Sequence, residues 1–303
     1  MRRTARFVVV ALAIAASALI VSACGSGDDV GAKDGPTITI GSANFSENAL
    51  IAEIYAQALE ANGFPVERKF NIGNREIYAP ALESGELDLV PEYIGTVLAS
   101  HLGGTPTSDS DATLAALRAA WEPMGVEVLD YAPAQDKNGF AVTGATAESL
   151  GLSKVSDLAA YNGTLVLGGP PECPKRDLCL PGLETVYGLS FAEFKPLDVG
   201  GPITVAALEG DEIQVGVLFT SDGTILAKGF VLLEDDKGLQ PAENVAPAVR
   251  KEIVDAYGPD FTETLNGVSR RLTTEDLVSL NKRVGIDGED PEVVARDWLA
   301  ETD

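Results

Sequence analysis

Short apolar runs alternate with helical stretches through the first hundred residues of the chain. Thr37–Gly41, Val66–Phe70 and Leu87–Val90 have the length and apolar character of buried strands. Leu50–Leu59 and Glu76–Ser84 lie between them and place apolar residues at helical spacing. A strand, helix, strand, helix, strand order is typical of a parallel sheet covered by helices, because a crossover joins parallel neighbours. The sequence therefore predicts an α/β fold.

The same alternation returns in the middle of the chain, between Thr164 and Phe219. From Ala246 onward, apolar residues such as Val249 and Ile253 recur on helical faces, and this tail is predicted to be mostly helical. Two α/β segments predict two lobes, and 303 residues are enough for a hydrophobic core in each.

The N-terminus has the parts of a secretory signal. Three arginines within the first six residues precede the uncharged run Phe7–Ala23, which ends in small residues directly before Cys24. This segment resembles the lipobox of bacterial lipoproteins, which implies removal of residues 1–23 and acyl chains on Cys24. Several acyl chains give durable anchoring, so we expect a lipid-anchored protein on the extracytoplasmic face of the cell membrane. A plain secretory signal and an N-terminal transmembrane helix remain alternatives, although the run is short for a bilayer span.

Residues 24–36 are rich in Gly and Asp and are expected to form a flexible tether from the lipid. The whole chain has 22 Lys and Arg against 46 Asp and Glu, a net charge of −24. Such acidity argues against nucleic acid or anionic lipid as a partner. Cys173 and Cys179 lie in a Pro/Gly-rich loop and are predicted to form a disulfide outside the cytoplasm. Their spacing, with no nearby His, does not fit a zinc site.

The sequence lacks the patterns of an enzyme. Its single histidine, His101, ends a predicted helix, and no phosphate-binding glycine loop, nucleophile elbow or His/Cys cluster is present. Acidic pairs such as Asp235-Asp236 are expected to be solvated rather than to bind a metal. We therefore predict a protein without catalytic activity, metal or cofactor. A surface lipoprotein without a small-molecule cleft remains an alternative class.

Four segments carry a resemblance to a known family: Gly41–Asn48, Glu83–Thr96, Thr220–Gly223 and Leu232–Lys237. Together they resemble the osmoprotectant-binding proteins of bacterial ABC importers, which take up glycine betaine, choline, carnitine and related compounds. The resemblance implies a type II periplasmic-binding-protein fold, in which two α/β lobes close over a solute in the cleft between them.

By that resemblance, one lobe comprises residues 37–138 and 222–303, and the other comprises residues 139–221. The chain would then cross between the lobes twice. The implied function is to capture a small compatible solute and to deliver it to an ABC permease. The implied partners are the permease and, through the permease, its ATPase complex.

The resemblance and the strand order together indicate the cleft residues. Ligands of open α/β sheets bind beyond the carboxyl ends of strands. A quaternary ammonium group has no N–H to donate and needs aromatic faces, whereas a carboxylate on the same solute needs N–H groups, Lys or Arg. The expected ligand-binding residues are Asn44, Phe45, Ser46, Tyr93, Thr96, Gln135, Asp136, Asn138, Arg176, Phe219, Thr220 and Asp222. The structural alternatives are a helix N-cap for Ser46, a packing ring for Tyr93 and a surface charge for Arg176.

Several positions depart from the family pattern. Ala43 stands where many members have Lys, and Phe219 stands where Tyr is frequent. Asn138 and Glu243 occupy positions that are often aromatic, and Glu243 could balance a cation or be a solvated surface residue. A more polar site of this kind, built from Gln135, Asp136, Asn138 and Thr220, would suit a solute with hydroxyls or amines. The identity of the solute therefore stays open.

Overall fold

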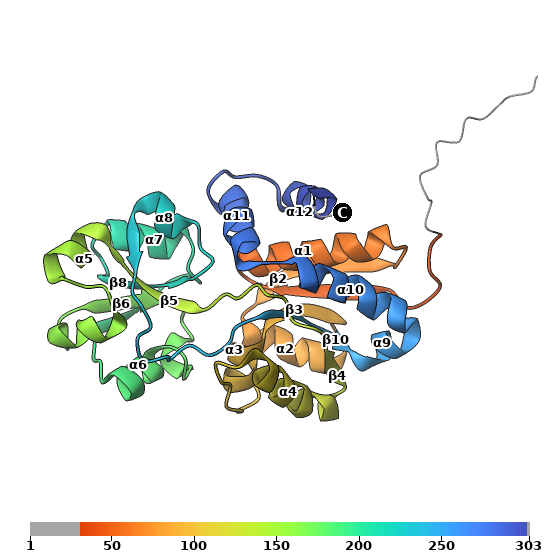
Figure 1. The fold of residues 1–303 in the computed structure, drawn as a ribbon, viewed down its shortest axis with the longest axis horizontal. Helices are drawn as coiled ribbons and strands as arrows, with labels where there is room; N and C mark the ends of the chain where they lie inside the picture. The colour runs from red at the N-terminus through yellow and green to blue at the C-terminus, as the bar shows by residue number, and fades with distance from the viewer. Residues whose placement is uncertain (1–30, 302–303) are drawn as a thin grey trace, which may run out of the picture. The chain divides into compact units, whose positions relative to one another are not determined.

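The computed structural model describes residues 31–301. The expected signal segment and Cys24 lie outside the described residues. Two five-stranded sheets form the framework, with the strand orders β2-β1-β3-β10-β4 and β7-β6-β8-β5-β9 (Figure 1). We call these sheets, each with its covering helices, the first lobe and the second lobe. The predicted two-lobed α/β architecture is confirmed.

The first sheet contains parallel and antiparallel neighbours. Its strands are β1 (Ile38–Ala43), β2 (Val66–Gly73), β3 (Leu89–Tyr93), β4 (Val126–Val128) and β10 (Val245–Arg250). β1 runs parallel to β2 and β3, whereas β10 runs antiparallel to β3 and β4. The parallel strands β1, β2 and β3 therefore end at the same edge of the sheet, as the helical connections between them require.

Helices cover both faces of the first sheet. One core joins β1, β3 and β10 to α1 (Ser46–Ala61), α10 (Pro259–Arg271), α11 (Thr274–Gly285) and α12 (Pro291–Glu301). The other core joins β3, β4 and β10 to α2 (Arg75–Ser84), α3 (Ile94–Ser100) and α4 (Ser110–Trp121). Within the described residues, no helix has the length and hydrophobicity to cross a membrane.

β10 corrects one expectation from the sequence, because its residues were expected to begin the helical tail. Val245 and Val249 pack into the core on one face of the sheet, and Ala246 and Ala248 pack into the core on the other. A strand that is buried on both faces reads as a continuous apolar run, so its period does not distinguish it from a helix. The helical tail begins with α9 (Lys251–Tyr257).

The second lobe has the same layered arrangement around its own sheet. Its strands are β5 (Asn138–Thr143), β6 (Val166–Gly169), β7 (Glu193–Pro196), β8 (Val215–Phe219) and β9 (Phe230–Leu232). β6 runs parallel to β7 and β8, and β5 runs antiparallel to β8 and β9. Its helices are α5 (Gly144–Leu150), α6 (Leu180–Tyr187), α7 (Pro202–Glu209) and α8 (Thr224–Lys228).

The boundary expected at residue 222 is wrong. β9 follows that residue but pairs with β5 in the second sheet, and Leu233 and Leu239 pack into the core of the second lobe. β9 forms the edge of the second sheet next to β5, so the chain is still in the second lobe at residues 230–232. The return to the first lobe therefore comes after Leu239.

Two neighbouring segments join the lobes (Figure 1). Gln135 and Asn244 form an antiparallel bridge. Asp136 N donates to the carbonyl of Glu243 at 3.1 Å, and Glu243 N donates to Gln135 Oε1 at 3.3 Å. We call residues 135–138 and 240–244 the outgoing and return crossovers.

The end of the expected tether is held against the first lobe. Lys33 Nζ lies 2.8 Å from Asp260 Oδ2 and 4.7 Å from the centre of the Phe64 ring. Tyr257 donates to the carbonyl of Pro36 at 2.6 Å. The described part of the segment 24–36 is therefore attached from Lys33 onward, where a free tether was expected.

Candidate functional site

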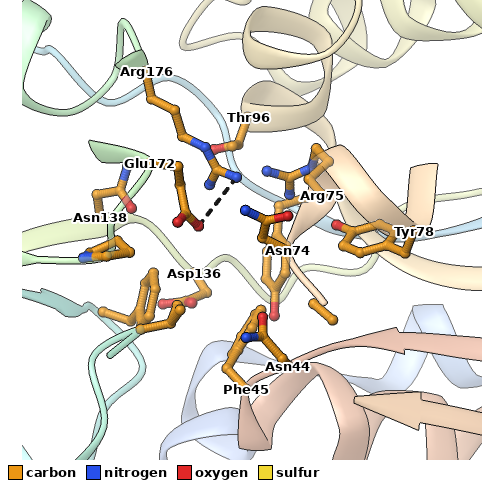
Figure 2. A pocket seen from close by; sticks show the side chains of 15 residues that line it. Asn44, Phe45, Asn74, Arg75, Tyr78, Thr96, Asp136, Asn138, Glu172 and Arg176 are labelled. Atoms are coloured by element: carbon orange, nitrogen blue, oxygen red, sulfur yellow. Dashed lines mark ion pairs between the residues drawn. The ribbon is translucent and has the colours of Figure 1, made fainter. Parts of the chain in front are cut away.

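A cavity of about 60 Å³ lies where the carboxyl ends of strands from both sheets meet. From the first lobe, the wall contains Phe45 after β1, Arg75 at the start of α2 and Thr96 in the first turn of α3. From the second lobe, it contains Glu172 after β6 and Phe219 at the end of β8. The cavity thus lies where ligands of open α/β sheets bind (Figure 2).

Buried polar side chains fix the turns of the first lobe. Asn48 Oδ1 accepts the N–H of Ala43 at 2.7 Å, and Asn48 Nδ2 donates to the carbonyl of Pro91 at 3.0 Å. This one side chain ties the end of β1 to β3. Ser42 Oγ accepts the N–H of Asn71 at 2.8 Å and ties β1 to β2. These bonds hold the residues after the three strands in a fixed relation.

Three aromatic rings adjoin each other at the cavity. Phe45, from the first lobe, stacks on Phe219, from the second lobe, with 5.6 Å between ring centres. The ring of Tyr93 lies 6.0 Å from that of Phe45. The cavity is much smaller than the roughly 300–1,000 Å³ of typical ligand pockets, so a solute that binds between Phe45 and Phe219 has to separate them.

The Glu47 carboxylate accepts the hydroxyl of one of these rings and joins the lobes. Glu47 Oε1 accepts the Tyr93 hydroxyl at 2.6 Å. Its Oε2 accepts Ser221 Oγ from the second lobe and Asn281 Nδ2 from α11. Burial, with the nearby Glu47 carboxylate, raises the pKa of Tyr93 well above its ordinary value. Tyr93 is therefore a neutral hydrogen-bond donor here.

Asp136 is a second buried carboxyl at the cavity and lies on the outgoing crossover. Asp136 Oδ1 accepts the N–H of Ser221 at 3.1 Å and lies 3.5 Å from Thr220 Oγ1. Burial and then the negative charge of Glu47 raise the pKa of Asp136 well above its ordinary value, against the lowering effect of Ser221. This shift favours the protonated form of the carboxyl more than in an exposed aspartate.

Two arginines line the opposite wall of the cavity (Figure 2). Arg75 Nε and Nη2 both donate to the buried carboxylate of Glu92, the shortest contact being 2.9 Å. Burial alone would lower the pKa of Arg75, but Glu92 outweighs it and raises that pKa. Arg176 Nη2, in the second lobe, lies 3.0 Å from Glu76 in the first lobe and 3.4 Å from Glu172.

The disulfide between Cys173 and Cys179 is formed, with 5.2 Å between the two Cα atoms. It closes the loop that carries Arg176. Asn138 Nδ2 and Gln240 Nε2 both donate to the carbonyl of Leu178, at 3.2 and 2.9 Å. Both crossovers therefore hold this loop, which positions Arg176 at the cavity.

Comparisons with known proteins decide the family. The model of the substrate-binding domain of ABC-type glycine betaine transport systems matches residues 36–301. The chain belongs to this family. It is thus the substrate-binding component of an osmoprotectant ABC transporter, and members of the family are extracytoplasmic transport proteins rather than enzymes. Among residues 31–301, no cluster of three metal-ligating side chains occurs.

Two curated relatives cover most of this binding protein. The glycine-betaine-binding protein of Pseudomonas aeruginosa is 30% identical over 290 residues, which is 92% of each chain. The glycine betaine-binding protein YehZ of Escherichia coli is 29% identical over 280 residues, 86% of this chain and 89% of that protein.

Solved structures share the fold. Apo YehZ from Escherichia coli has a TM-score of 0.63 at 28% identity and covers 88% of this chain and 99% of its own. A structure described as a glycine betaine/carnitine/choline ABC transporter has a TM-score of 0.70 at 24% identity and covers 87% and 98%. The predicted periplasmic-binding-protein fold is confirmed.

The structure brings most of the residues expected from the sequence to one place. The cavity is lined by Asn44, Phe45, Tyr93, Thr96, Asp136, Asn138, Arg176 and Phe219. Ser46 and Asp222 line an adjoining groove of about 740 Å³ instead. Ser46 begins α1, but Phe45 occupies the N-cap position and no side chain caps the helix there. Asp222 accepts the N–H of Thr224 and orders the turn before α8.

Gln135 and Thr220 line neither the cavity nor the groove. The Gln135 side chain accepts Glu243 N across the two crossovers. Thr220 Oγ1 accepts Lys137 N at 2.9 Å, and Thr220 N donates to the Lys137 carbonyl. Both residues stabilise the connection between the lobes, so they do not enlarge the polar part of the cavity wall.

Glu243 corrects another expectation, because it is neither a solvated surface residue nor part of the cavity wall. It is 1% exposed, and its carboxylate accepts both the N–H and the hydroxyl of Thr96. Burial raises the pKa of Glu243 to about 7, although Thr96 opposes the shift. Glu243 therefore holds the start of α3 behind the cavity.

Sequence reasoning missed several residues of the wall, above all Asn74, Arg75, Tyr78 and Glu172. Asn74 and Arg75 directly follow β2 and begin α2. The rule that indicated Phe45 after β1, that ligands bind beyond the carboxyl ends of strands, applies equally to them. Many family members have a cationic Lys at the position of Ala43, and in this chain Arg75 supplies a cationic side chain to the same cavity.

Proposed function

We propose that this protein binds a quaternary ammonium solute that carries a carboxylate, such as glycine betaine, and delivers it to its permease. The observation that carries this proposal is the pairing of three aromatic rings with two arginines across one cavity. The rings of Phe45, Tyr93 and Phe219 provide faces for the cation. Arg75 and Arg176 provide donors for the carboxylate.

The structure favours a zwitterion over the more polar solute that the sequence left open. Gln135 and Thr220 were expected to make the site polar, but neither lines the cavity. Ala43 cannot pair with a solute carboxylate as the Lys of many family members could, and Arg75 supplies a cationic side chain for that carboxylate instead. The two curated relatives described above are named as glycine betaine-binding proteins, which supports this choice.

Calorimetric titration with glycine betaine and choline tests the proposal. Both probes carry the same trimethylammonium group, but choline has a hydroxyl in place of the carboxylate. We expect glycine betaine to bind more tightly, and Arg176→Gln to weaken glycine betaine binding about tenfold while changing choline binding less than threefold. Equal losses for both probes would remove Arg176 from the carboxylate site. Failure of both probes to bind would contradict the proposed function.

We also propose that residues 1–23 are a signal segment and that Cys24 carries acyl chains outside the cytoplasm. The charged start, the short apolar run and the small residues before Cys24 support this. Protein from membranes should begin at Cys24 and have the mass of an acylated chain, whereas Cys24→Ser should release the protein from the membrane. An unmodified Cys24 in the membrane fraction would contradict the anchor.

A further inference from the structure

Two carboxyl groups lie buried together at the base of the cleft. Asp136 is 6% exposed and Glu47 is 4% exposed, and both line the groove that adjoins the cavity. Asp136 also lines the cavity, together with Phe45 and Phe219. Figure 2 shows Asp136 and Phe45 there. Ser221 contacts both carboxyls, through its N–H to Asp136 and through its hydroxyl to Glu47. Ionising two buried carboxyls this near each other has a large electrostatic cost, so the pair favours keeping a proton.

The hydrogen bonds place that proton on Asp136. Glu47 accepts three side-chain donors, Tyr93, Ser221 and Asn281, which together engage both of its oxygens. Asp136 Oδ1 accepts the N–H of Ser221 at 3.1 Å, and the Thr220 hydroxyl lies 3.5 Å from the same oxygen. Within residues 31–301, the other oxygen of Asp136 has no such donor. Donors favour the charged form of a carboxyl, so the scarcity of donors at Asp136 favours its protonated form.

No cationic side chain among residues 31–301 makes an ion pair with either carboxyl. The arginines of the cavity wall are engaged by other acids, Arg75 by Glu92 and Arg176 by Glu76 and Glu172. The remaining charged side chains around Asp136 do not compensate it. Lys137 is next in the chain but makes no ion pair with it. Asp222, after β8, and Glu243, on the return crossover, are acidic and cannot compensate its charge.

We propose that a cationic solute replaces the proton of this pair, so that each quaternary ammonium group bound releases one proton from Asp136 to the solvent. The proposal rests on the proposed function. Before binding, the Asp136–Glu47 pair carries one negative charge and one proton. Afterwards both carboxyls are ionised beside the cation, and the proton has passed to buffer. The charge balances because the cation enters as the proton leaves.

The solute itself cannot account for such a proton. A quaternary ammonium group has no N–H, and the carboxylate of glycine betaine stays ionised near neutral pH. Asp136 therefore makes affinity depend on pH. At pH values below the pKa of Asp136 in the free protein, affinity for the cation should increase by up to about tenfold for each unit that the pH is raised.

Calorimetric titration with choline and glycine betaine in phosphate and in ACES buffer near neutral pH tests this proposal. These buffers differ in ionisation enthalpy, so the difference between the two binding enthalpies gives the number of protons released. We expect about one proton for the wild type and almost none for Asp136→Asn, which preserves the shape of the side chain. Glu47→Gln should also reduce the release, because it removes the second carboxyl of the pair.

Glu243→Gln is the matched control, because Glu243 is an equally buried acid that lies outside the cavity wall. It should release the same number of protons as the wild type. Release that is lost in Glu243→Gln but kept in Asp136→Asn would overturn the proposal. Binding without proton release in the wild type would overturn it and leave the proposed function intact. Absence of binding by both probes would overturn both.

Discussion

The carboxylate of Glu243 accepts two hydrogen bonds from Thr96, from its backbone N–H at 2.9 Å and from its hydroxyl at 2.7 Å. Thr96 lies in the first turn of α3, where backbone N–H groups have no partner within the helix. Glu243 lies on the return crossover. One buried acid therefore satisfies a helix start in the first lobe and fixes the chain that arrives from the second.

Glu243→Gln should change how stability depends on pH. Burial raises the pKa of Glu243 to about 7 in the folded protein, whereas a Glu in the unfolded chain has a pKa of about 4.3. The folded state thus binds the proton more tightly, and this contribution to the free energy of unfolding is lost as pH rises from about 4.3 through about 7. The wild type should lose stability relative to Glu243→Gln by at most about 1.4 kcal/mol per pH unit in this window. Urea unfolding between pH 5 and pH 8 measures the difference, and a constant difference would refute the prediction.

Tyr93→Phe should destabilise the protein by about 2 kcal/mol, because it removes a donor from the buried Glu47 carboxylate and leaves the ring in place. Tyr131→Phe is a matched control, since the Tyr131 hydroxyl donates to Asp111 at an exposed site. Its effect should stay within about 0.5 kcal/mol. Denaturant unfolding of both variants distinguishes the two cases, and equal losses would contradict the importance of burial.

Phe219→Leu should weaken glycine betaine binding by about five- to tenfold, because leucine retains apolar surface but has no aromatic face for the cation. Phe219→Tyr retains the ring and should bind within about threefold of the wild type. Calorimetric titration of the two variants provides the comparison. If Leu and Tyr at this position gave the same affinity, Phe219 would contribute only packing.

Loss of the disulfide through Cys173→Ser with Cys179→Ser should lower the free energy of unfolding by about 2 kcal/mol, as expected for a short closed loop. Arg176 lies within that loop, so affinity for glycine betaine should fall more than affinity for choline. Unfolding and calorimetric titration of the double variant measure the two effects. A larger loss for choline would show that the loop does not act through Arg176.

Local patterns in the sequence predicted the fold well where each strand or helix has a pattern of its own. α1, which begins at Ser46, and α2, which ends before Gly85, have clear helical periodicity and clear stop signals. β10 was mistaken for a helix because both of its faces are buried. β9 was assigned to the wrong lobe because a three-residue strand carries no pairing information until β5 is beside it.

The site was predicted in part, and the errors have physical causes. Phe45 lies just after β1 and Tyr93 ends β3, and both were found from the family resemblance together with the strand order. Arg75 follows a strand in the same way, but a charged residue at a helix start reads as a surface residue when its buried partner, Glu92, is unknown. The burial of Glu243 depends on the meeting of two crossovers that are more than a hundred residues apart. Such contacts have no local signal.

β10 lies between β3 and β4, and within residues 31–301 it is the only strand that pairs with β4. During synthesis, β4 therefore cannot pair until β10 has been made, more than a hundred residues later. By contrast, every strand of the second sheet lies within the continuous stretch 138–232. A nascent chain that stops before Val245 would expose an unpaired sheet edge. The second lobe can therefore fold first, and the sheet of the first lobe is complete only after β10 has been synthesised.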